Sequence, residues 1–202
     1  MDHRKKYELD IQNRSLFRYY LGLGARLKKH LYYSYARFIA RKNGATIGDN
    51  VVMPFSLARR ANNNLIIGNN SSIQTDLIDL RTNVTIGSNV IIGSGVEILT
   101  CSHLIDSPDW EFKAHGILIE DYVWIATRAF ILPSCRKIGY GAVCAAGSLV
   151  ANDVETMSVI SGNPALHLKT RSQVHSNLVV PSLLGGDLTI YIQTWNKRKI
   201  KI

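Results

Sequence analysis

An aliphatic residue recurs at every sixth position over much of this chain, and this rhythm constrains the fold more than any other feature. Two series carry it, each with one inserted residue: Ile67, Ile73, Leu80, Ile86, Ile92 and Ile98, then Ile119, Ile125, Ile131, Ile138, Cys144 and Val150. Four places after each member stands another small or aliphatic residue. A helix repeats every 3.6 residues and a half-buried strand every two, so neither gives a period of six.

Six residues suffice for a short strand and a corner, and three such units close a triangular coil of about eighteen residues. The aliphatic position then points into a prism, and stacked coils satisfy each other's backbone hydrogen bonds. Asn50, Asn70 and Asn89, together with glycines, recur where tight corners would fall. We therefore expect a parallel β-helix over residues 44–160, followed by a C-terminal segment and tail, 161–202.

The rhythm fails between His103 and Leu118. This break predicts a loop, residues 104–118, that projects from the prism, and loops on rigid scaffolds often carry chemistry.

The first 43 residues form a different, basic segment. They hold eleven Lys/Arg against three Asp/Glu, and apolar residues from Leu16 to Phe38 fall three or four apart. This spacing predicts one or two helices that end at Gly44. We interpret the apolar stripe as packing on the rest of the protein, with contact to an anionic membrane surface as the alternative. Because the net charge of +9 resides at the two ends rather than over the body, nucleic acid is not the expected partner.

Composition also bears on the compartment. Cys101, Cys135 and Cys144 are odd in number and lack metal-type spacing, which favours a reducing cytoplasm. Arg18 interrupts the first apolar stretch, so it does not resemble a signal peptide, and no run of eighteen apolar residues is present. We expect a cytoplasmic protein, with the inner membrane face as a peripheral location.

Four motifs on the repeat point to a family. The stretch SHLIDSPDW is followed by VWIATRAFILP, then by AVCAAGSLVAND and SGNPA. Over residues 44–171 the chain resembles the bacterial hexapeptide-repeat acyltransferases, and within them the sugar and exopolysaccharide O-acetyltransferases related to maltose, galactoside and colanic acid acetyltransferases. The resemblance implies an all-β domain, a left-handed parallel β-helix with a helical arm before it and an extension after it. It further implies a homotrimer, acetyl-CoA as acyl donor between neighbouring prisms, direct transfer to a sugar hydroxyl, and no metal.

The resemblance also assigns residues. The family's catalytic histidine falls on His103. Its coenzyme-binding positions fall on Trp124, Thr127, Ala146, Ala151, Asn152 and Lys169. The chain departs from the family at Ala126 and Ser134, where glycine is usual, and at Ala151 and Asn152, where a Thr-Lys pair is usual. Arg136 and Lys137 occupy a corner that the family fills with small or aliphatic residues.

A sugar hydroxyl must lose its proton as it attacks a thioester, and an imidazole with a pKa near 6.5 suits that task. The extruded loop supplies candidate acceptor contacts: Asp106, Asp109 and His115 for hydroxyl groups, and Trp110 for stacking on a sugar face. The acceptor is expected to be a saccharide, nucleotide- or lipid-linked, in surface polysaccharide synthesis.

Other interpretations stay open at this stage. An amino sugar could be N-acetylated instead, or the departures could have closed the coenzyme groove and left an inactive trimeric scaffold. Cys101, two residues before His103, could act as a nucleophile. Metal catalysis needs three ligands, whereas the repeat region holds only His103 and His115.

Overall fold

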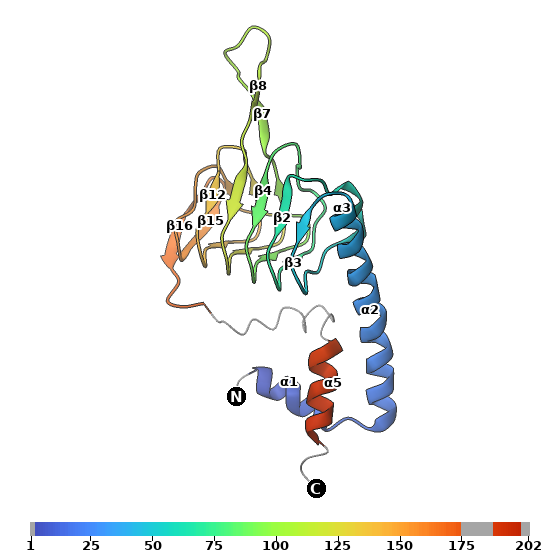
Figure 1. Ribbon diagram of the computed structural model, residues 1–202. Coiled ribbons are helices and arrows are strands. Elements are labelled where there is room, and N and C mark those ends of the chain that lie inside the picture. The colour runs from blue at the N-terminus through green and yellow to red at the C-terminus, as the bar shows by residue number, and fades with distance from the viewer. Residues whose placement is uncertain (1–2, 175–187, 199–202) are drawn as a thin grey trace.

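The structure, a computed structural model, describes residues 3–174 and 188–198. Its body is a three-sided prism of short parallel strands stacked in coils (Figure 1). One face consists of β1 (Thr46–Ile47), β2 (Leu65–Ile67), β4 (Val84–Ile86), β9 (Ile117–Ile119) and β12 (Lys137–Ile138). A second face consists of β3 (Ser72–Ile73), β5 (Ile91–Ile92), β10 (Trp124–Ile125), β13 (Val143–Cys144) and β15 (Ser158–Gly162). The third consists of β6 (Glu97–Ile98), β11 (Phe130–Ile131) and β14 (Leu149–Val150).

The sixfold aliphatic positions form the core. Each stacks on its equivalent in the next coil, as Ile67 does on Ile86 and Ile86 on Ile119. Every member of the two predicted series is buried, and most are fully inaccessible. Burying an isoleucine side chain stabilises a fold by about 1.5 to 3 kcal/mol, so this column supplies much of the prism's stability.

One coil departs from the predicted phase. Ile78, not Leu80, bridges to Ile98 and takes the inward position on the third face. Leu77, four places after Ile73, is 48% exposed. The spacing from Ile73 to Ile78 is one residue shorter than the period, and the spacing from Ile78 to Ile86 is two residues longer.

The recurrent asparagines shape one edge of the prism. Asn50, Asn70 and Asn89 have φ of 56°, 58° and 59°, a left-handed conformation that asparagine tolerates better than most residues. The Asn50 side-chain amide donates to Asn70 Oδ1 at 3.1 Å, which links successive coils. The predicted role of these residues in tight corners is confirmed.

The described helices lie outside the prism, so an all-β description fits the prism alone. They are α1 (His3–Gln12), α2 (Leu16–Lys42), α3 (Phe55–Arg60) and α5 (Leu188–Asn196). Ser15 caps α2, accepting from the backbone N–H of Arg18 at 3.4 Å, and the helix ends just before Gly44, whose φ is +100°.

Helix α2 crosses the first coil at the end of the prism and continues beyond it to meet α1 and α5 (Figure 1). Ala36 and Ala40 are fully buried against the prism side. Beyond the prism, Tyr19 stacks on Tyr191 and Trp195 of α5, with ring centroids 5.2 and 4.1 Å apart. None of the described helices combines the length and apolarity that crossing a bilayer requires.

The expected packing of the apolar stripe of α2 on the rest of the protein is wrong. Leu16, Tyr20, Leu31 and Phe38 are each at least 60% exposed. The helix packs on the prism through its opposite side, where small residues such as Ala36 and Ala40 are buried.

The break in the repeat forms a β-hairpin of β7 (Cys101–His103) and β8 (Phe112–Ala114) that projects from the prism (Figure 1). It begins at Cys101, and the coil resumes at Ile117, so the projecting segment starts and ends slightly earlier than residues 104–118. After the last coil, β16 (Ala165–Thr170) pairs antiparallel with β15. Of the predicted C-terminal segment, residues 175–187 and 199–202 lie outside the described residues.

Candidate active site

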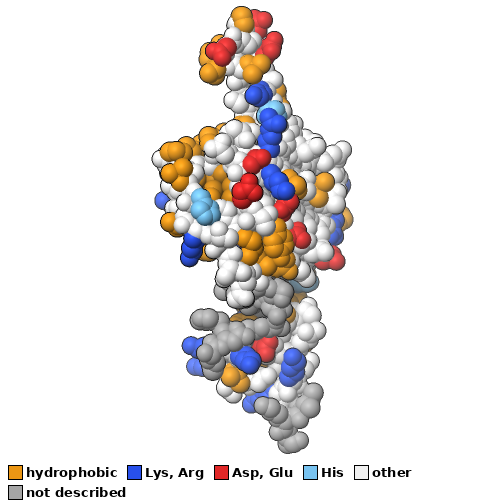
Figure 2. Space-filling view, turned by 90° about the vertical axis from the view of Figure 1, so that its left-hand side faces the viewer, with side chains coloured by type: hydrophobic (Ala, Val, Ile, Leu, Met, Phe, Trp, Pro, Cys, Tyr) orange, Lys and Arg blue, Asp and Glu red, His pale blue; other side chains and the backbone are white. Residues whose placement is uncertain are grey.

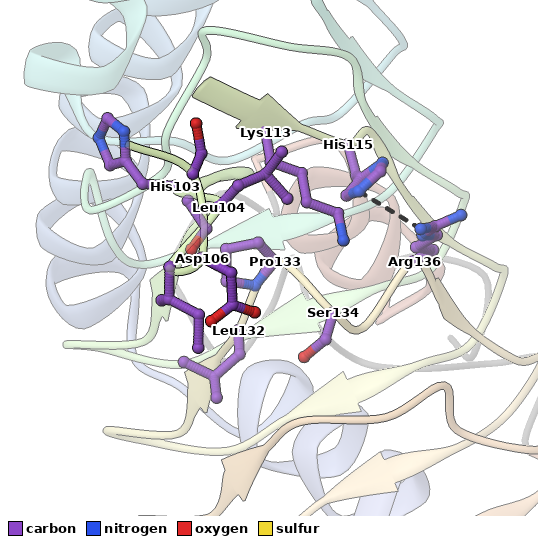
Figure 3. Close-up of a pocket in the computed structure, with 12 residues that line it drawn as sticks. His103, Leu104, Asp106, Lys113, His115, Leu132, Pro133, Ser134 and Arg136 are labelled. Atoms are coloured by element: carbon purple, nitrogen blue, oxygen red, sulfur yellow. Dashed lines mark hydrogen bonds between the residues drawn. The ribbon is translucent and has the colours of Figure 1, made fainter. Parts of the chain in front are cut away.

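A pocket of about 740 Å³ opens between the base of the hairpin and the corner that follows β11. The hairpin contributes His103, Asp106, Lys113 and His115, and the corner contributes Leu132, Pro133, Ser134 and Arg136 (Figure 3).

His103 is held by a backbone group. Its Nδ1 lies 2.6 Å from the carbonyl oxygen of Trp110, and its ring meets the Phe112 ring edge to face at 5.8 Å. Because a carbonyl oxygen only accepts, Nδ1 must be the protonated nitrogen, and in the neutral ring Nε2 then carries the lone pair. The imidazole is thus oriented, solvent-exposed and basic at Nε2.

The far wall of the pocket is cationic. A guanidinium nitrogen of Arg136 lies 3.3 Å from His115 Nε2, so the imidazole accepts from it (Figure 3). Desolvation first, then the charges of Arg136 and Lys113, lower the pKa of His115. The positive charges of Arg136 and Lys113 therefore disfavour protonation of His115.

A coil corner fastens the base of the hairpin. The Asp79 carboxylate pairs with the Arg81 guanidinium through two contacts of 2.9 Å and accepts from the backbone N–H of Thr100 at 3.3 Å. The hydrogen bonds from Arg81 hold the pKa of Asp79 well below its usual range. Thr82 Oγ1 donates to the carbonyl of His115 at 3.0 Å, so both ends of the hairpin are anchored to one corner.

The predicted acceptor residues divide into two groups. Asp106 and His115 line the pocket with His103. Asp109 and Trp110 lie in the exposed outer turn of the hairpin and are not among its lining residues. What Trp110 gives the site is its carbonyl, which the sequence could not indicate.

The predicted coenzyme residues Thr127 and Ala146 lie at stacked corners. The backbone N–H of Gly147 donates to the carbonyl of Thr127 at 3.0 Å, and both predicted side chains are exposed. Trp124, on β10 just before this corner, is 48% exposed.

These corners lie away from His103 within one chain. Thr127 precedes β11, whereas Leu132, in the His103 pocket, follows it. Thr127 and Arg128 form the turn before β11, and Pro133 and Ser134 form the turn after it. One chain therefore places the two groups at opposite edges of the same prism face.

The remaining predicted coenzyme residues form a third group. Ala151 and Asn152 follow β14 and line a separate cavity of about 320 Å³ with His167. Lys169 is exposed on β16. Asp153, which also lines this cavity, accepts from the backbone N–H of Arg136 at 2.6 Å, and β14 stacks on β11. Ala151 and Asn152 therefore lie at the same edge of the prism as the His103 pocket, one coil further on.

Two charged pocket residues, Lys113 and Arg136, were not predicted as site residues. Lys113 lies two residues before the predicted His115 on the second arm of the hairpin, and strand alternation was the available signal for a shared face. Arg136 stood out only as a departure from the family pattern, although the structure brings its side chain to the pocket.

The cysteines show no activation. Cys101 is buried, with Sγ 3.5 Å from Thr100 Oγ1, and burial raises the pKa of Cys135 and of Cys144 to about 12. Among the described residues, no three His, Cys, Asp or Glu side chains cluster as metal ligands would.

A prism of hexapeptide coils, with an oriented histidine on a projecting hairpin and exposed small-residue corners, defines an acyltransferase of the hexapeptide-repeat class. Comparison with known proteins leads to the same class. The chain is 32% identical over 141 residues to WcaF of Escherichia coli, named as a colanic acid biosynthesis acetyltransferase; the match covers 69% of this chain and 76% of WcaF. It is 37% identical over 95 residues to YvoF of Bacillus subtilis, named as an acetyltransferase, but that match covers 47% of this chain and only 52% of YvoF.

Solved structures share the fold. The hexapeptide-repeat acetyltransferase VCA0836 of Vibrio cholerae has a TM-score of 0.59 and 26% identity, covering 84% of this chain and 89% of that one. Its complex with acetyl coenzyme A gives a TM-score of 0.58 at 24% identity and 84% and 85% coverage. No family model matches the sequence. The chain belongs to the hexapeptide-repeat acetyltransferases, and the likeness in fold agrees with the left-handed β-helix expected for them.

Proposed function

We propose that this protein is an acetyl-CoA-dependent O-acetyltransferase that acts on a saccharide hydroxyl in surface polysaccharide synthesis, in the cytoplasm. The carrying observation is the bond between His103 Nδ1 and the Trp110 carbonyl, because it orients an exposed imidazole at the rim of the pocket and leaves the lone pair on Nε2. The relative WcaF, named for colanic acid synthesis, supports the acceptor class, and the acetyl coenzyme A complex of VCA0836 supports the donor.

In this mechanism, His103 Nε2 accepts the proton of the acceptor hydroxyl as its oxygen attacks the thioester carbonyl. The Trp110 carbonyl stabilises the imidazolium through the Nδ1–H bond, much as a carboxylate does in a catalytic triad. When the tetrahedral intermediate collapses, the C–S bond breaks and Nε2 returns the proton to the leaving thiolate. No covalent enzyme intermediate forms.

The donor groove is proposed to run along the corners of Thr127 and Ala146 beside Trp124, with Lys169 toward the coenzyme phosphates. Ala151 and Asn152 lie at the His103 edge and would reach the coenzyme from the neighbouring prism. Since His103 lies at the other edge of the same face, a neighbouring prism would complete each site. This geometry supports a homotrimer with its active sites between subunits.

The acceptor is proposed to enter the hairpin pocket. Asp106 and His115 line it and would bind sugar hydroxyls, while Asp109 and the ring of Trp110 would close over a larger saccharide. Lys113 and Arg136 fit an acceptor that also carries a phosphate, as a nucleotide- or lipid-linked sugar does.

The first test is calorimetric titration with acetyl-CoA, followed by turnover with saccharide acceptors. We expect micromolar binding, about −8 kcal/mol. His103→Ala should keep that affinity and lower kcat by about 10²- to 10⁴-fold, the usual contribution of a general base. His30→Ala, on α2, is the matched control and should retain the wild-type rate.

The alternatives have distinct outcomes. A well-folded protein that does not bind acetyl-CoA would be a scaffold. Faster turnover of amino sugars than of hydroxyl acceptors, measured side by side, would make it an N-acetyltransferase. A near-normal rate in His103→Ala would remove the histidine from the mechanism.

A further inference from the structure

Helix α2 carries an apolar face that no described part of the chain covers. Its members are between 45% and 77% exposed: Leu16, Phe17, Tyr20, Leu21, Leu27, Leu31, Tyr35 and Phe38. At 100° per residue they fall within an arc of about 140°. Tyr35 contacts Phe55 on one side, yet still exposes 56% of its surface.

The face points away from the prism. Ala36 and Ala40, which pack on the first coil, lie on the opposite side of the helix. An arc this wide normally faces a protein core. With 27 residues the helix is about 40 Å long, so the exposed strip exceeds what a soluble monomer usually leaves in water.

The charge of α2 identifies the occupant. The helix contains seven basic residues and no Asp or Glu: Arg18, Arg26, Lys28, Lys29, Arg37, Arg41 and Lys42. At 100° per residue, Lys28 and Lys42 fall within the arc, whereas the five arginine and lysine residues that remain lie outside it. Two copies of α2 packed face to face would bring Lys28 and Lys42 together without helix acids to pair with them. An anionic lipid surface offers both an apolar layer for the face and negative charge for the cations.

We propose that α2 lies on an anionic membrane surface, with its apolar face at the boundary between headgroups and acyl chains and Lys28 and Lys42 among the headgroups. Both lysines are exposed at positions beside or within the arc. Because α2 crosses the end of the prism, the coils stack away from the bilayer (Figure 1). The end of the prism opposite α2, which faces the viewer in Figure 2, would then point away from the bilayer.

The test is co-sedimentation of the full chain with vesicles of phosphatidylcholine alone or mixed with phosphatidylglycerol. We expect binding only to the mixed vesicles, lost at about 1 M salt, where the Debye length falls to about 3 Å. The double variant Leu27→Ser, Leu31→Ser should bind at least tenfold more weakly. Leu166→Ser with Leu168→Ser, on β16, is the matched control: those side chains are 70% and 65% exposed, and their loss should leave binding unchanged.

Two results would overturn the proposal: no binding to anionic vesicles, or a Leu27/Leu31 variant that dissociates by light scattering while vesicle binding persists. The latter would make the face a contact between copies of this chain. Calorimetric titration of each variant with acetyl-CoA accompanies these assays. Unchanged acetyl-CoA binding in a variant that no longer sediments separates the membrane proposal from the proposed enzymatic function.

Discussion

At the residue scale, the orientation of His103 in the candidate site depends on one contact, with the backbone carbonyl of Trp110. Trp110 has a φ of 51°, which turns its carbonyl toward His103, and its N–H donates to the carbonyl of Ser107 at 3.1 Å. A histidine before an extruded loop is visible in the sequence, but the group that selects its tautomer is not. Backbone acceptors have no residue signature, so this part of the site required the structure.

The cationic wall gives a prediction for His115. Desolvation, Arg136 and Lys113 together lower its pKa, so replacing Arg136 by glutamine should raise that pKa toward 6.5. Histidine resonances followed by NMR during a pH titration measure the change. Arg128→Gln, at another exposed corner, is the control and should leave His115 unaffected.

The direction of the His115 pKa shift also determines how this residue contributes to stability as pH changes. Where the folded pKa of a histidine lies below its unfolded value, the unfolded chain binds more protons between the two, and stability falls as pH drops through that window. The pH dependence contributed by His115 should therefore be smaller in Arg136→Gln than in the wild type. An unchanged His115 titration in that variant would show that Arg136 does not perturb the imidazole.

At the scale of single elements, alanine substitutions at two glycines are expected to change the stability of the protein in opposite directions. A Cβ on Gly139 would lie 2.6 Å from the backbone nitrogen of Thr156 in the next coil, whereas a Cβ on Gly24 of α2 meets nothing within 4 Å. Gly139→Ala should destabilise the protein by about 1 to 3 kcal/mol through overpacking. Gly24→Ala should stabilise it by about 0.5 to 1 kcal/mol through helix propensity. Urea unfolding at one fixed protein concentration compares them, and equal effects would contradict the coil spacing.

The sequence predicts the prism better than it predicts the contacts of α2. The prism follows from local rules, because each six-residue unit carries its own inward residue and corner. Its one error, Leu80 for Ile78, arose because a spacing of five residues is followed by one of eight, which a series with a single insertion of one residue does not reveal. The helical period correctly predicted a helix from Leu16. An apolar stripe indicates that the helix has a partner surface, but it does not identify that surface.

At the scale of the whole molecule, the separation of His103 from Thr127 gives the proposed trimer a testable consequence. The hairpin pocket and the corners of Thr127 and Ala146 lie at opposite ends of β11 and β14. In a ring with threefold symmetry, the His103 edge of each prism would meet the Thr127 edge of the next. Every site would then use the histidine of one chain and the groove of another.

Mixed trimers test this arrangement. His103→Ala removes the base, and Ala146→Trp would fill the groove from an exposed corner without entering the core. Each variant alone should be inactive. When the two are co-expressed and assemble at random, a site works only if its histidine comes from the Ala146→Trp chain and its groove from the His103→Ala chain, so about a quarter of the wild-type activity should return. Mixing the two proteins after separate purification, without subunit exchange, is the control and should restore nothing. Co-expressed trimers without activity would mean that each chain builds its site alone, and the donor groove would then have to lie at the hairpin edge, beside Leu132 and Ser134.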